Sequence, residues 1–247
     1  MQRYFVNHFR DNFFYISEED RHHILKVMRL KAGDKIVCAT NGKSAICSIE
    51  EITDDQVIAK VVKWEEDSVE LPVKVAIASG LPKGDKLEWI IQKGTELGAS
   101  MFIPFTATRS VVKWDEKKAT KKVERWNKIA KEAAEQSHRQ VLPEVQHPVN
   151  LKSLIELSKS FHHKLIAFEE DAKEGETSVL NNSLTNIEKE QSVIFVFGPE
   201  GGLTLEEVSL LKENGFQSCG LGPRILRTET APLYALSAVS YHTELMR

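Results

Sequence analysis

The stretch VIFVFGPEGGLTLEE, residues 193–207, joins an apolar run to three glycines and then to a helix start. Five apolar residues in succession are typical of a strand that is buried on both faces of a sheet. Glycine loses more chain entropy on folding than any other residue. Three glycines within 198–202 therefore indicate unusual dihedral angles or a close approach of the backbone to another group. The stretch predicts a buried strand that ends at a functional loop.

Two patterns divide the chain at residue 71. Before this point, strand-like runs follow one another, and Asn41-Gly42 suits a tight hairpin turn. These runs are 35–39, 44–52 and 56–62. After it, apolar strands alternate with helices, which predicts a largely parallel sheet of the α/β class. We expect a small β-rich domain over residues 1–71 and an α/β domain over residues 72–247.

The predicted elements have recognisable ends and faces. Asp85 and Glu88 fit a capping box ahead of a helix over 85–98. A long helix is expected over 115–138, and the polar residues 169–192 are expected to form a long loop. In the first domain, Ser17 would cap a short helix with Ile24, Val27 and Met28 on one face. The later strands are predicted over 73–79, 101–105, 165–168, 193–197 and 218–221.

Composition is that of an ordinary soluble globule, with 247 residues and a formal net charge of −3. The charge is uneven, because residues 50–70 carry eight acids against two lysines, and residues 113–139 carry nine Lys and Arg against five acids. No signal peptide or membrane span is evident, so we expect a cytoplasmic protein. The three cysteines, Cys38, Cys47 and Cys219, are predicted to be reduced core thiols. No metal site is expected.

Two glycine-bearing loops follow strands in the C-terminal third, FGPEGG at 197–202 and LGPRILRTETA at 221–231. Ligands of open α/β sheets bind beyond the carboxyl ends of the strands, so both loops would face one cleft. Small residues there let main-chain groups reach a flat polar molecule such as an adenine. The alternative for either loop alone is that glycine and proline only shape a turn. A P-loop and a GxGxxG fingerprint are absent, which disfavours a Rossmann-type site.

Several motifs together resemble one family. The segments GLPKGDKLEWIIQKGTELG, PFTATRSVV, KIAKEAAEQSHR, FGPEGGLT and LGPRILRTETA look like those of the RsmE family, the bacterial small-subunit (16S) ribosomal RNA uridine N3-methyltransferases of the SPOUT superfamily. The resemblance spans nearly the whole chain. It implies a PUA-like small β-barrel domain for RNA binding over 1–71 and a SPOUT α/β methyltransferase domain over 72–247. A deep trefoil knot and the cofactor site are then expected within about 164–247.

The resemblance also implies the cofactor, the partners and the cofactor-binding residues. We expect S-adenosyl-L-methionine as cofactor, 16S ribosomal RNA or the assembled small subunit as substrate, and a homodimer. The cofactor-binding residues are predicted to be Gly198, Pro199, Glu200, Gly201, Gly202, Leu221, Gly222, Arg224, Ile225, Leu226, Thr230 and Ala231.

Methylation of uracil N3 requires loss of the N3 proton, and a cation near the base carbonyls would stabilise the resulting anion. Arg227 and Arg224 are the candidates for this role. Glu229 is a weaker candidate for the proton acceptor, because an acid close to two arginines also serves to orient them. Glu200 is expected to position the loop through hydrogen bonds to backbone amides.

RNA contact requires exposed basic side chains. The candidates are Arg3, Arg10, Arg21 and Arg29 in the first domain and Lys122 and Arg125 on the long helix. A solvated helix face is the alternative for any single cation. Two alternative functions remain: a non-catalytic RNA-binding ribosome assembly factor, and a knotted methyltransferase that acts on another RNA position. Cofactor binding separates the first alternative from the enzyme.

Overall fold

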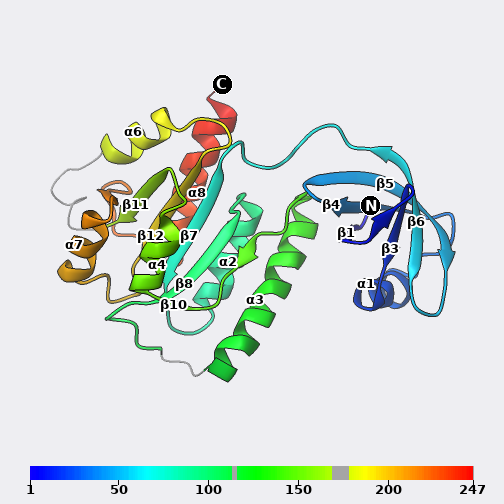
Figure 1. Ribbon diagram of the computed structural model, residues 1–247, viewed down its shortest axis with the longest axis horizontal. Coiled ribbons are helices and arrows are strands. Elements are labelled where there is room, and N and C mark those ends of the chain that lie inside the picture. Colours follow the sequence, from blue (N-terminus) through cyan, green and yellow to red (C-terminus); the bar gives the residue numbers. More distant parts are fainter. Residues whose placement is uncertain (113–115, 169–177, 247) are drawn as a thin grey trace. The chain divides into compact units, whose positions relative to one another are not determined.

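The computed structural model describes residues 1–112, 116–168 and 178–246, and the chain divides into two units (Figure 1). Unit 1 contains Met1–Glu70 and Ala134–Leu142, and unit 2 contains Leu71–Ala133 and Pro143–Arg247. The predicted helix over 115–138 is found as α3, Glu116–Gln136.

Unit 1 is built on one six-stranded sheet in the order β1-β4-β5-β6-β3-β2. Its strands are β1 Arg3–Phe5, β2 Phe9–Arg10, β3 Phe13–Ile16, β4 Lys35–Thr40, β5 Lys43–Ile52 and β6 Val57–Trp64. We expected a PUA-like small β-barrel; the strand order gives a sheet whose edge strands β1 and β2 do not pair with each other. Asn41 and Gly42 both have positive φ angles, +49° and +74°, which confirms the hairpin turn.

The first helix of unit 1 differs from its prediction. It consists of α1, Glu18–His22, and a π-helical turn η1, His23–Val27, and Ser17 makes no side-chain cap. Ile24 is fully buried, whereas Val27 and Met28 are exposed, because the π turn changes the spacing of side chains around the axis. Cys38 and Cys47 are buried free thiols in the core beneath the sheet, as predicted.

Unit 2 contains a seven-stranded sheet in the order β10-β8-β7-β12-β11-β13, with β9 also paired to β8. Every pairing is parallel, which confirms the α/β prediction. The strands are β7 Lys74–Gly80, β8 Met101–Thr106, β9 Glu144–Val145, β10 Val149–Asn150, β11 His163–Ala167, β12 Ser192–Phe197 and β13 Gln217–Cys219. Cys219 is a buried free thiol, as predicted.

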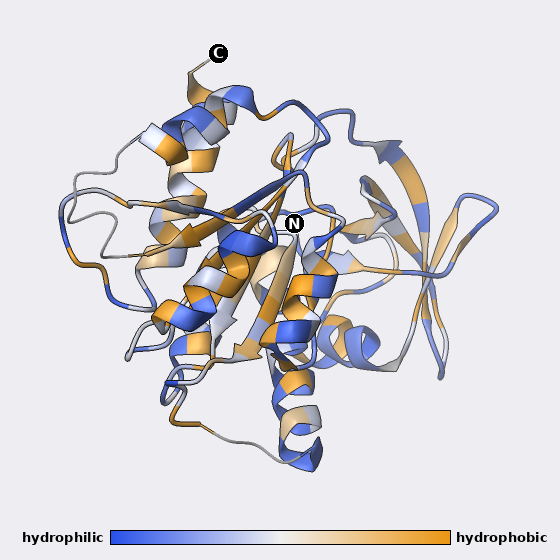
Figure 2. Ribbon diagram, turned by 60° about the vertical axis from the view of Figure 1, so that its left-hand side comes forward, coloured by the Kyte–Doolittle hydropathy of each residue, from blue (hydrophilic) through white to orange (hydrophobic). Residues whose placement is uncertain are grey.

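Helices cover both faces of this sheet, because successive side chains of each strand point to opposite faces. Val75 and Ile77 of β7 belong to one core cluster, with side chains of α2, α3 and α8, whereas Ala76 and Ala78 belong to the other, with side chains of α4 and α7. Figure 2 shows the strands of the sheet as mainly hydrophobic and the helices as mixed. The helices are α2 Lys86–Glu96, α4 Leu151–Ser158, α6 Ser178–Asn186, α7 Leu205–Glu213, α8 Ala231–Ser240 and the π-helical turn η2 Tyr241–Leu245.

Two local expectations for unit 2 are wrong. Part of the expected loop over 169–192 is the helix α6, and residues 169–177 lie outside the described part of the chain. Asp85 makes no side-chain cap, and Glu88 instead accepts hydrogen bonds from Arg125 at 2.7 and 2.8 Å and from Lys122 at 3.1 Å. Burial raises the pKa of Glu88, but these bonds outweigh it and hold the pKa below its usual range.

This cluster joins α2 to α3 and gives a stability prediction. We expect Glu88→Gln to lower the free energy of unfolding by about 1–2 kcal/mol at pH 7, because charge-assisted bonds to two cations are weakened. A carboxylate whose pKa is lowered in the folded state stabilises the protein at pH values above its unfolded pKa, which is near 4.3 for Glu. This stabilisation is lost as the pH falls through the pKa of the folded state. The difference between the variant and the wild type should therefore shrink below about pH 4.

Urea denaturation at pH 7 and at pH 3.5 measures this difference. Glu124→Gln is the matched control, because Glu124 is exposed on α3. It should change stability by less than about 0.5 kcal/mol. A loss for Glu88→Gln that stays the same at both pH values would contradict the ion-pair explanation.

Candidate cofactor site

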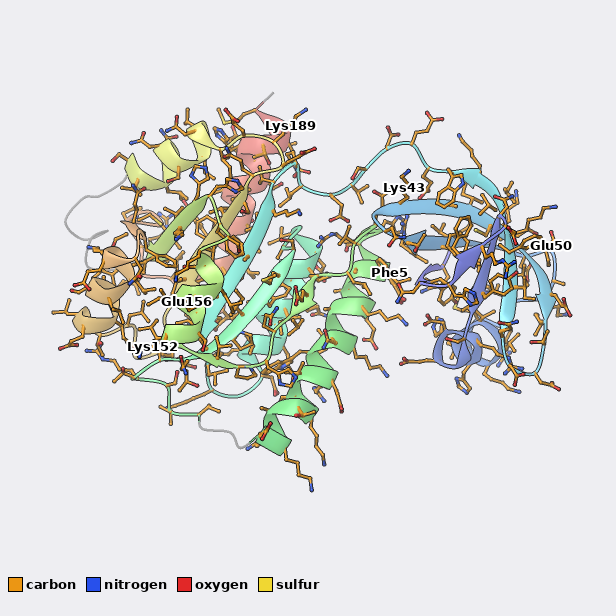
Figure 3. All side chains as sticks on the ribbon, viewed as in Figure 1. Phe5, Lys43, Glu50, Lys152, Glu156 and Lys189 are labelled. Carbon is orange, nitrogen blue, oxygen red and sulfur yellow. The ribbon has the colours of Figure 1, made fainter. Side chains whose placement is uncertain are left out.

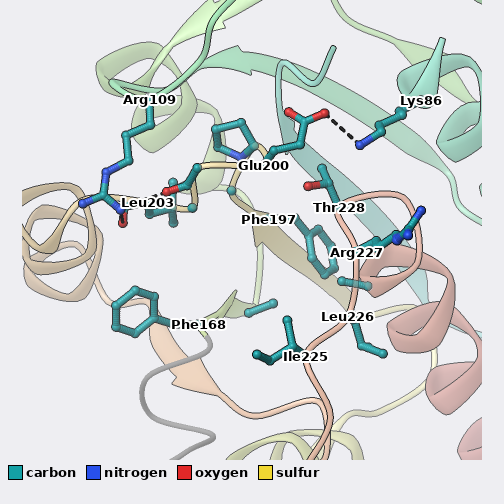
Figure 4. Close-up of a pocket in the computed structure, with 16 residues that line it drawn as sticks. Lys86, Arg109, Phe168, Phe197, Glu200, Leu203, Ile225, Leu226, Arg227 and Thr228 are labelled. Atoms are coloured by element: carbon teal, nitrogen blue, oxygen red, sulfur yellow. Dashed lines mark hydrogen bonds and ion pairs between the residues drawn. The ribbon is translucent and has the colours of Figure 1, made fainter. Parts of the chain in front are cut away.

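A cavity of about 530 Å3 lies in unit 2 beyond the carboxyl ends of β11 and β12 (Figure 4). The loop after β12 lines it from Phe197 to Leu203, and the segment before α8 lines it from Ile225 to Thr228. Ala167 and Phe168, at the end of β11, complete its apolar part. Both glycine-bearing loops therefore face one cavity, as their positions after parallel strands predicted.

A second cavity of about 90 Å3 adjoins the first. The two share the side chains of Phe168, Ile225 and Leu226, and the smaller one reaches Leu221, Gly222 and Arg224. Eleven of the twelve predicted cofactor-binding residues line one cavity or the other. Thr230 lines neither of the two, and it begins α8 without a side-chain cap.

Close packing of the loop requires glycine at Gly198 and at Gly80. A Cβ atom at Gly198 would lie 2.8 Å from the carbonyl carbon of Gly202 and 2.8 Å from the backbone nitrogen of Leu203. At Gly80, where β7 ends, a Cβ atom would lie 2.6 Å from the ring of Pro199. Glycine at these positions lets the loop fold back on itself and pack on β7, which leaves the cavity open in front of it.

Arg109 also holds this loop, although the sequence did not single it out. Its guanidinium donates to the carbonyl oxygens of Gly201 at 2.9 Å and Leu203 at 3.4 Å. The neighbouring Thr108 donates from its backbone nitrogen and its hydroxyl to Glu207 Oε1, at 2.7 and 3.0 Å. The loop after β8 is thus joined to the loop after β12.

Lys86 connects the two sides of the cavity. Its ammonium lies 2.9 Å from Glu200 Oε1, as Figure 4 shows. It also lies 3.5 Å from Glu229 Oε2. Glu200 also accepts a hydrogen bond from the backbone nitrogen of Lys83 at 3.1 Å. This is the positioning contact expected of Glu200, which binds an amide and an ammonium.

The pKa of Glu200 follows from these contacts. Burial raises it, but the hydrogen bonds from Lys86 and from backbone amides outweigh burial and hold the pKa below its usual range. The ion pair is therefore present above the usual carboxylate pKa and is lost as the pH falls through the lowered value. The pKa of Lys86 is raised, first by its hydrogen bond to Glu200.

The predicted catalytic residues, Arg227, Arg224 and Glu229, have different surroundings. Arg227 lines the larger cavity and Arg224 the smaller one, and both side chains are exposed. Figure 4 shows Arg227 extending away from the apolar floor of Phe168 and Ile225. Glu229 pairs with Lys86.

The predicted RNA-binding residues fall into two groups. Arg10 and Arg29 are exposed, and Arg10 pairs with its neighbour Asp11 at 2.9 Å. Arg3 is 6% exposed, with its guanidinium on Glu65 at 3.1 Å and on the carbonyl oxygen of Arg139. Arg21 donates to the carbonyl oxygen of Thr53. Arg3 is therefore withdrawn as an RNA contact, because its side chain is buried and its two terminal guanidinium nitrogens are paired within the protein.

Sequence relatives match this chain over its full length. The ribosomal RNA small subunit methyltransferase E of Bacillus subtilis is 53% identical over 253 residues, which cover 100% of this chain and 99% of that protein. The chain belongs to the ribosomal RNA small subunit methyltransferase E family. The RNA methyltransferase domain matches residues 69–240, and the RNA methyltransferase PUA domain matches residues 16–62. These matches confirm the resemblance found from the motifs and the PUA-like nature of the N-terminal domain.

Solved structures agree with this assignment to the methyltransferase E family. A crystal structure of a hypothetical protein is 51% identical, with a TM-score of 0.93 and full coverage of both chains. The ribosomal RNA small subunit methyltransferase E of Neisseria gonorrhoeae, solved bound to S-adenosyl methionine, is 26% identical with a TM-score of 0.81, and the match covers 97% of each chain.

Within residues 1–112, 116–168 and 178–246, no three His, Cys, Asp or Glu side chains are grouped as a metal site. None of the helices in this part of the chain is long and apolar enough to cross a membrane.

Proposed function

We propose that the protein transfers a methyl group from S-adenosyl-L-methionine to N3 of a specific uridine in 16S ribosomal RNA, in the cytoplasm. The observation that carries this proposal is the convergence of both glycine-bearing loops on one cavity of about 530 Å3. The assignment to the methyltransferase E family supports it, as does the cofactor-bound relative from Neisseria gonorrhoeae.

The residues of the cavity fit this cofactor. Its volume is within the usual range of small-molecule sites. Ile225 lines it and is 71% exposed, so a flat apolar ring packed against Ile225 and Phe168 would remove apolar surface from water. Main-chain groups of 198–202 and 224–226 would hold the polar parts of the cofactor. Arg109 holds the first of these segments, and Lys86 pairs with Glu200 in the first and with Glu229, which follows the second.

When bound, the cofactor would supply an electrophilic methyl group: in-line attack by a nucleophile forms the new bond to the methyl carbon, breaks its bond to the sulfonium sulfur, and leaves a neutral thioether. Uracil N3 becomes that nucleophile when it loses its proton, and the negative charge then spreads to the base carbonyls. Arg227, exposed at the rim of the cavity, is positioned to stabilise this charge. Because Glu229 is already paired with Lys86, we assign the proton to solvent and Glu229 to positioning Lys86.

We propose that unit 1 contacts RNA phosphates through exposed cations such as Arg10 and Arg29, and that α3 adds Lys122 and Arg125 from the Glu88 cluster. The methylated Watson–Crick edge must be unpaired, so folded RNA or the assembled subunit should be a better substrate than a short oligonucleotide. Affinity for RNA should fall steeply as salt rises. Filter binding at 50 and 200 mM salt measures this, and equal affinity at both would exclude phosphate contacts.

We further propose a homodimer and a trefoil knot within about 164–247, as in the family that the motifs resemble. The end of the chain supports the dimer, because Tyr241, Leu245 and Met246 are exposed apolar side chains. They belong to or adjoin η2, and a cavity of about 380 Å3 extends from there to Gly222 at the cofactor site. Light scattering at micromolar concentration should give twice the mass of the chain, and monomer alone would contradict the dimer.

The substrate is tested with tritiated S-adenosyl-L-methionine and three RNA substrates. These are assembled small subunits and folded 16S RNA from cells that lack the gene, and a short oligonucleotide. We expect label in assembled small subunits or folded 16S RNA and little in a short oligonucleotide. Binding of RNA without any transfer would favour the assembly-factor alternative. Label in a different RNA position would favour the alternative knotted methyltransferase.

Lys86 allows a test of how the loops are held. We expect Lys86→Met to weaken cofactor affinity by about three- to tenfold, because an exposed ion pair contributes modestly and here joins both sides of the cavity. Lys83→Met is the matched control, since Lys83 meets Glu200 through its backbone nitrogen. Calorimetric titration measures the cofactor affinity of both variants. Equal affinities would mean that the Lys86 side chain does not hold the loops in their binding conformation.

A further inference from the structure

Unit 1 contains a second cleft that the proposed methyl transfer does not use. It has a volume of about 750 Å3 and lies at the β4–β5 hairpin turn and the end of β6. Its lining includes Phe9, Trp64, the carboxylates of residues 65–67 and the side chain of Gln140, all of which belong to unit 1.

Two aromatic rings form a wall of this cleft. The ring centroids of Phe9 and Trp64 are 5.5 Å apart with an interplanar angle of 84°, and Phe14 packs behind both, at 4.6 and 6.1 Å. Phe9 is 39% exposed although it is a large apolar side chain. The face of an aromatic ring carries negative charge density, so aromatic side chains in the lining of a cleft favour a cation over an anion.

The polar part of the cleft also favours a cation. Glu65 is paired with Arg3, but Glu66 and Asp67 are exposed, and their carboxylates form no ion pair within the described residues. They outnumber the one lysine of the lining, Lys43. This segment is part of residues 50–70, which carry eight acids against two lysines.

Gln140 is an independent sign of a missing donor. It is 5% exposed, and its amide nitrogen donates to Ser44 Oγ at 2.9 Å and to the carbonyl oxygen of Asp67 at 3.0 Å. Its carbonyl oxygen Oε1 is buried without a hydrogen-bond partner. An orphaned acceptor in the lining of an acidic, aromatic cleft calls for an N–H donor, which a guanidinium or ammonium supplies.

We infer that this cleft binds a cationic side chain in an arginine- or lysine-rich peptide segment of a partner protein. The cation lies against Phe9 and Trp64 and is neutralised by Glu66 and Asp67. RNA phosphates would be repelled by the same carboxylates, so the cleft is distinct in its chemistry from the proposed RNA contacts. The inference does not depend on the methyl-transfer reaction.

The test uses the full-length protein and a fluorescein-labelled octa-arginine peptide, with binding followed by fluorescence anisotropy. The variant Glu66→Gln/Asp67→Asn removes the carboxylates of the cleft. The matched control Asp54→Asn/Asp55→Asn removes the same charge from the turn after β5. Figure 3 shows Lys43 and Glu50 towards opposite ends of β5, so this turn is remote from the cleft.

We expect the cleft variant to bind the peptide at least about fivefold more weakly and the control to change affinity less than about twofold. Phe9→Ala should also weaken binding, and an octa-citrulline peptide should not bind. The indole N–H resonance of Trp64 should shift on addition of the arginine peptide. Equal losses in the two double variants, or an unmoved Trp64 resonance, would overturn the inference. The inference would also be overturned if a uridine oligonucleotide shifted the Trp64 resonance and bound more weakly to the cleft variant but not to the control variant.

Discussion

Arg227→Ala is expected to lower the single-turnover rate of methyl transfer by about 10² to 10³, as for loss of one donor aimed at developing charge. Its side chain is exposed at the rim of the larger cavity, where it meets no fixed anion among the described residues. Cofactor affinity should change much less, because main-chain groups of the two loops provide most of that binding.

Arg224→Ala is the comparison that makes this result specific. Arg224 is close to Arg227 in the sequence, but of the two cavities it lines only the smaller one. Its loss should lower the rate by less than about tenfold. The rates are measured with enzyme saturated in both substrates. An Arg227→Ala enzyme running at the wild-type rate would remove this residue from the mechanism.

Gly198→Ala is expected to weaken cofactor affinity by about 10- to 100-fold. The new methyl group would lie 2.8 Å from the backbone at residues 202 and 203, so the loop must move. Overpacking of this kind costs about 1–3 kcal/mol, and each 1.4 kcal/mol corresponds to tenfold in affinity if the cost falls on the binding-competent loop. Calorimetric titration measures the effect.

Gly215→Ala is the matched control for backbone strain. Gly215 has φ of +86° and nothing within 4 Å of the position of a Cβ atom, so alanine there brings strain without a clash. It should lower stability by about 1 kcal/mol and leave cofactor affinity unchanged. Equal weakening of binding by the two substitutions would mean that the loop at Gly198 has no special role.

Apolar runs and helical periodicity were sufficient to predict the strands β4–β8 and β11–β13 and the helices α2 and α3, but not β1–β3, β9, β10 or α4. The apolar runs at 193–197 and 101–105 are continuous because both faces of a parallel sheet are covered, and they are found as β12 and β8. The helix α6 was missed because its sequence SVLNNSLTN is rich in Asn, Ser and Thr, which favour loops. Its buried Leu184 and partly buried Val179 and Leu180 pack on the core, and this tertiary packing outweighs the weak propensity.

The site was predicted in its main-chain part and missed in its supporting side chains. Glycine and proline at fixed offsets after a strand are local signals, so the loop at 198–202 could be identified from the sequence. Arg109 and Lys86 act on residues about 90 to 140 positions away, and no local pattern reports such contacts. The same limit applies to Arg3. The sequence predicted an exposed cation, but Arg3 is buried and pairs with Glu65, 62 positions away.

The most direct test of the proposed reaction is nucleoside analysis of 16S RNA after incubation of the protein with trideuteromethyl-labelled S-adenosyl-L-methionine. The RNA is taken from cells that lack the gene, digested to nucleosides, and separated by chromatography before mass spectrometry, because methyluridine isomers have equal mass. We predict labelled 3-methyluridine from a single position and no other labelled nucleoside. Labelled 5-methyluridine, a 2′-O-methyl nucleoside, or 16S RNA without label would contradict the proposal.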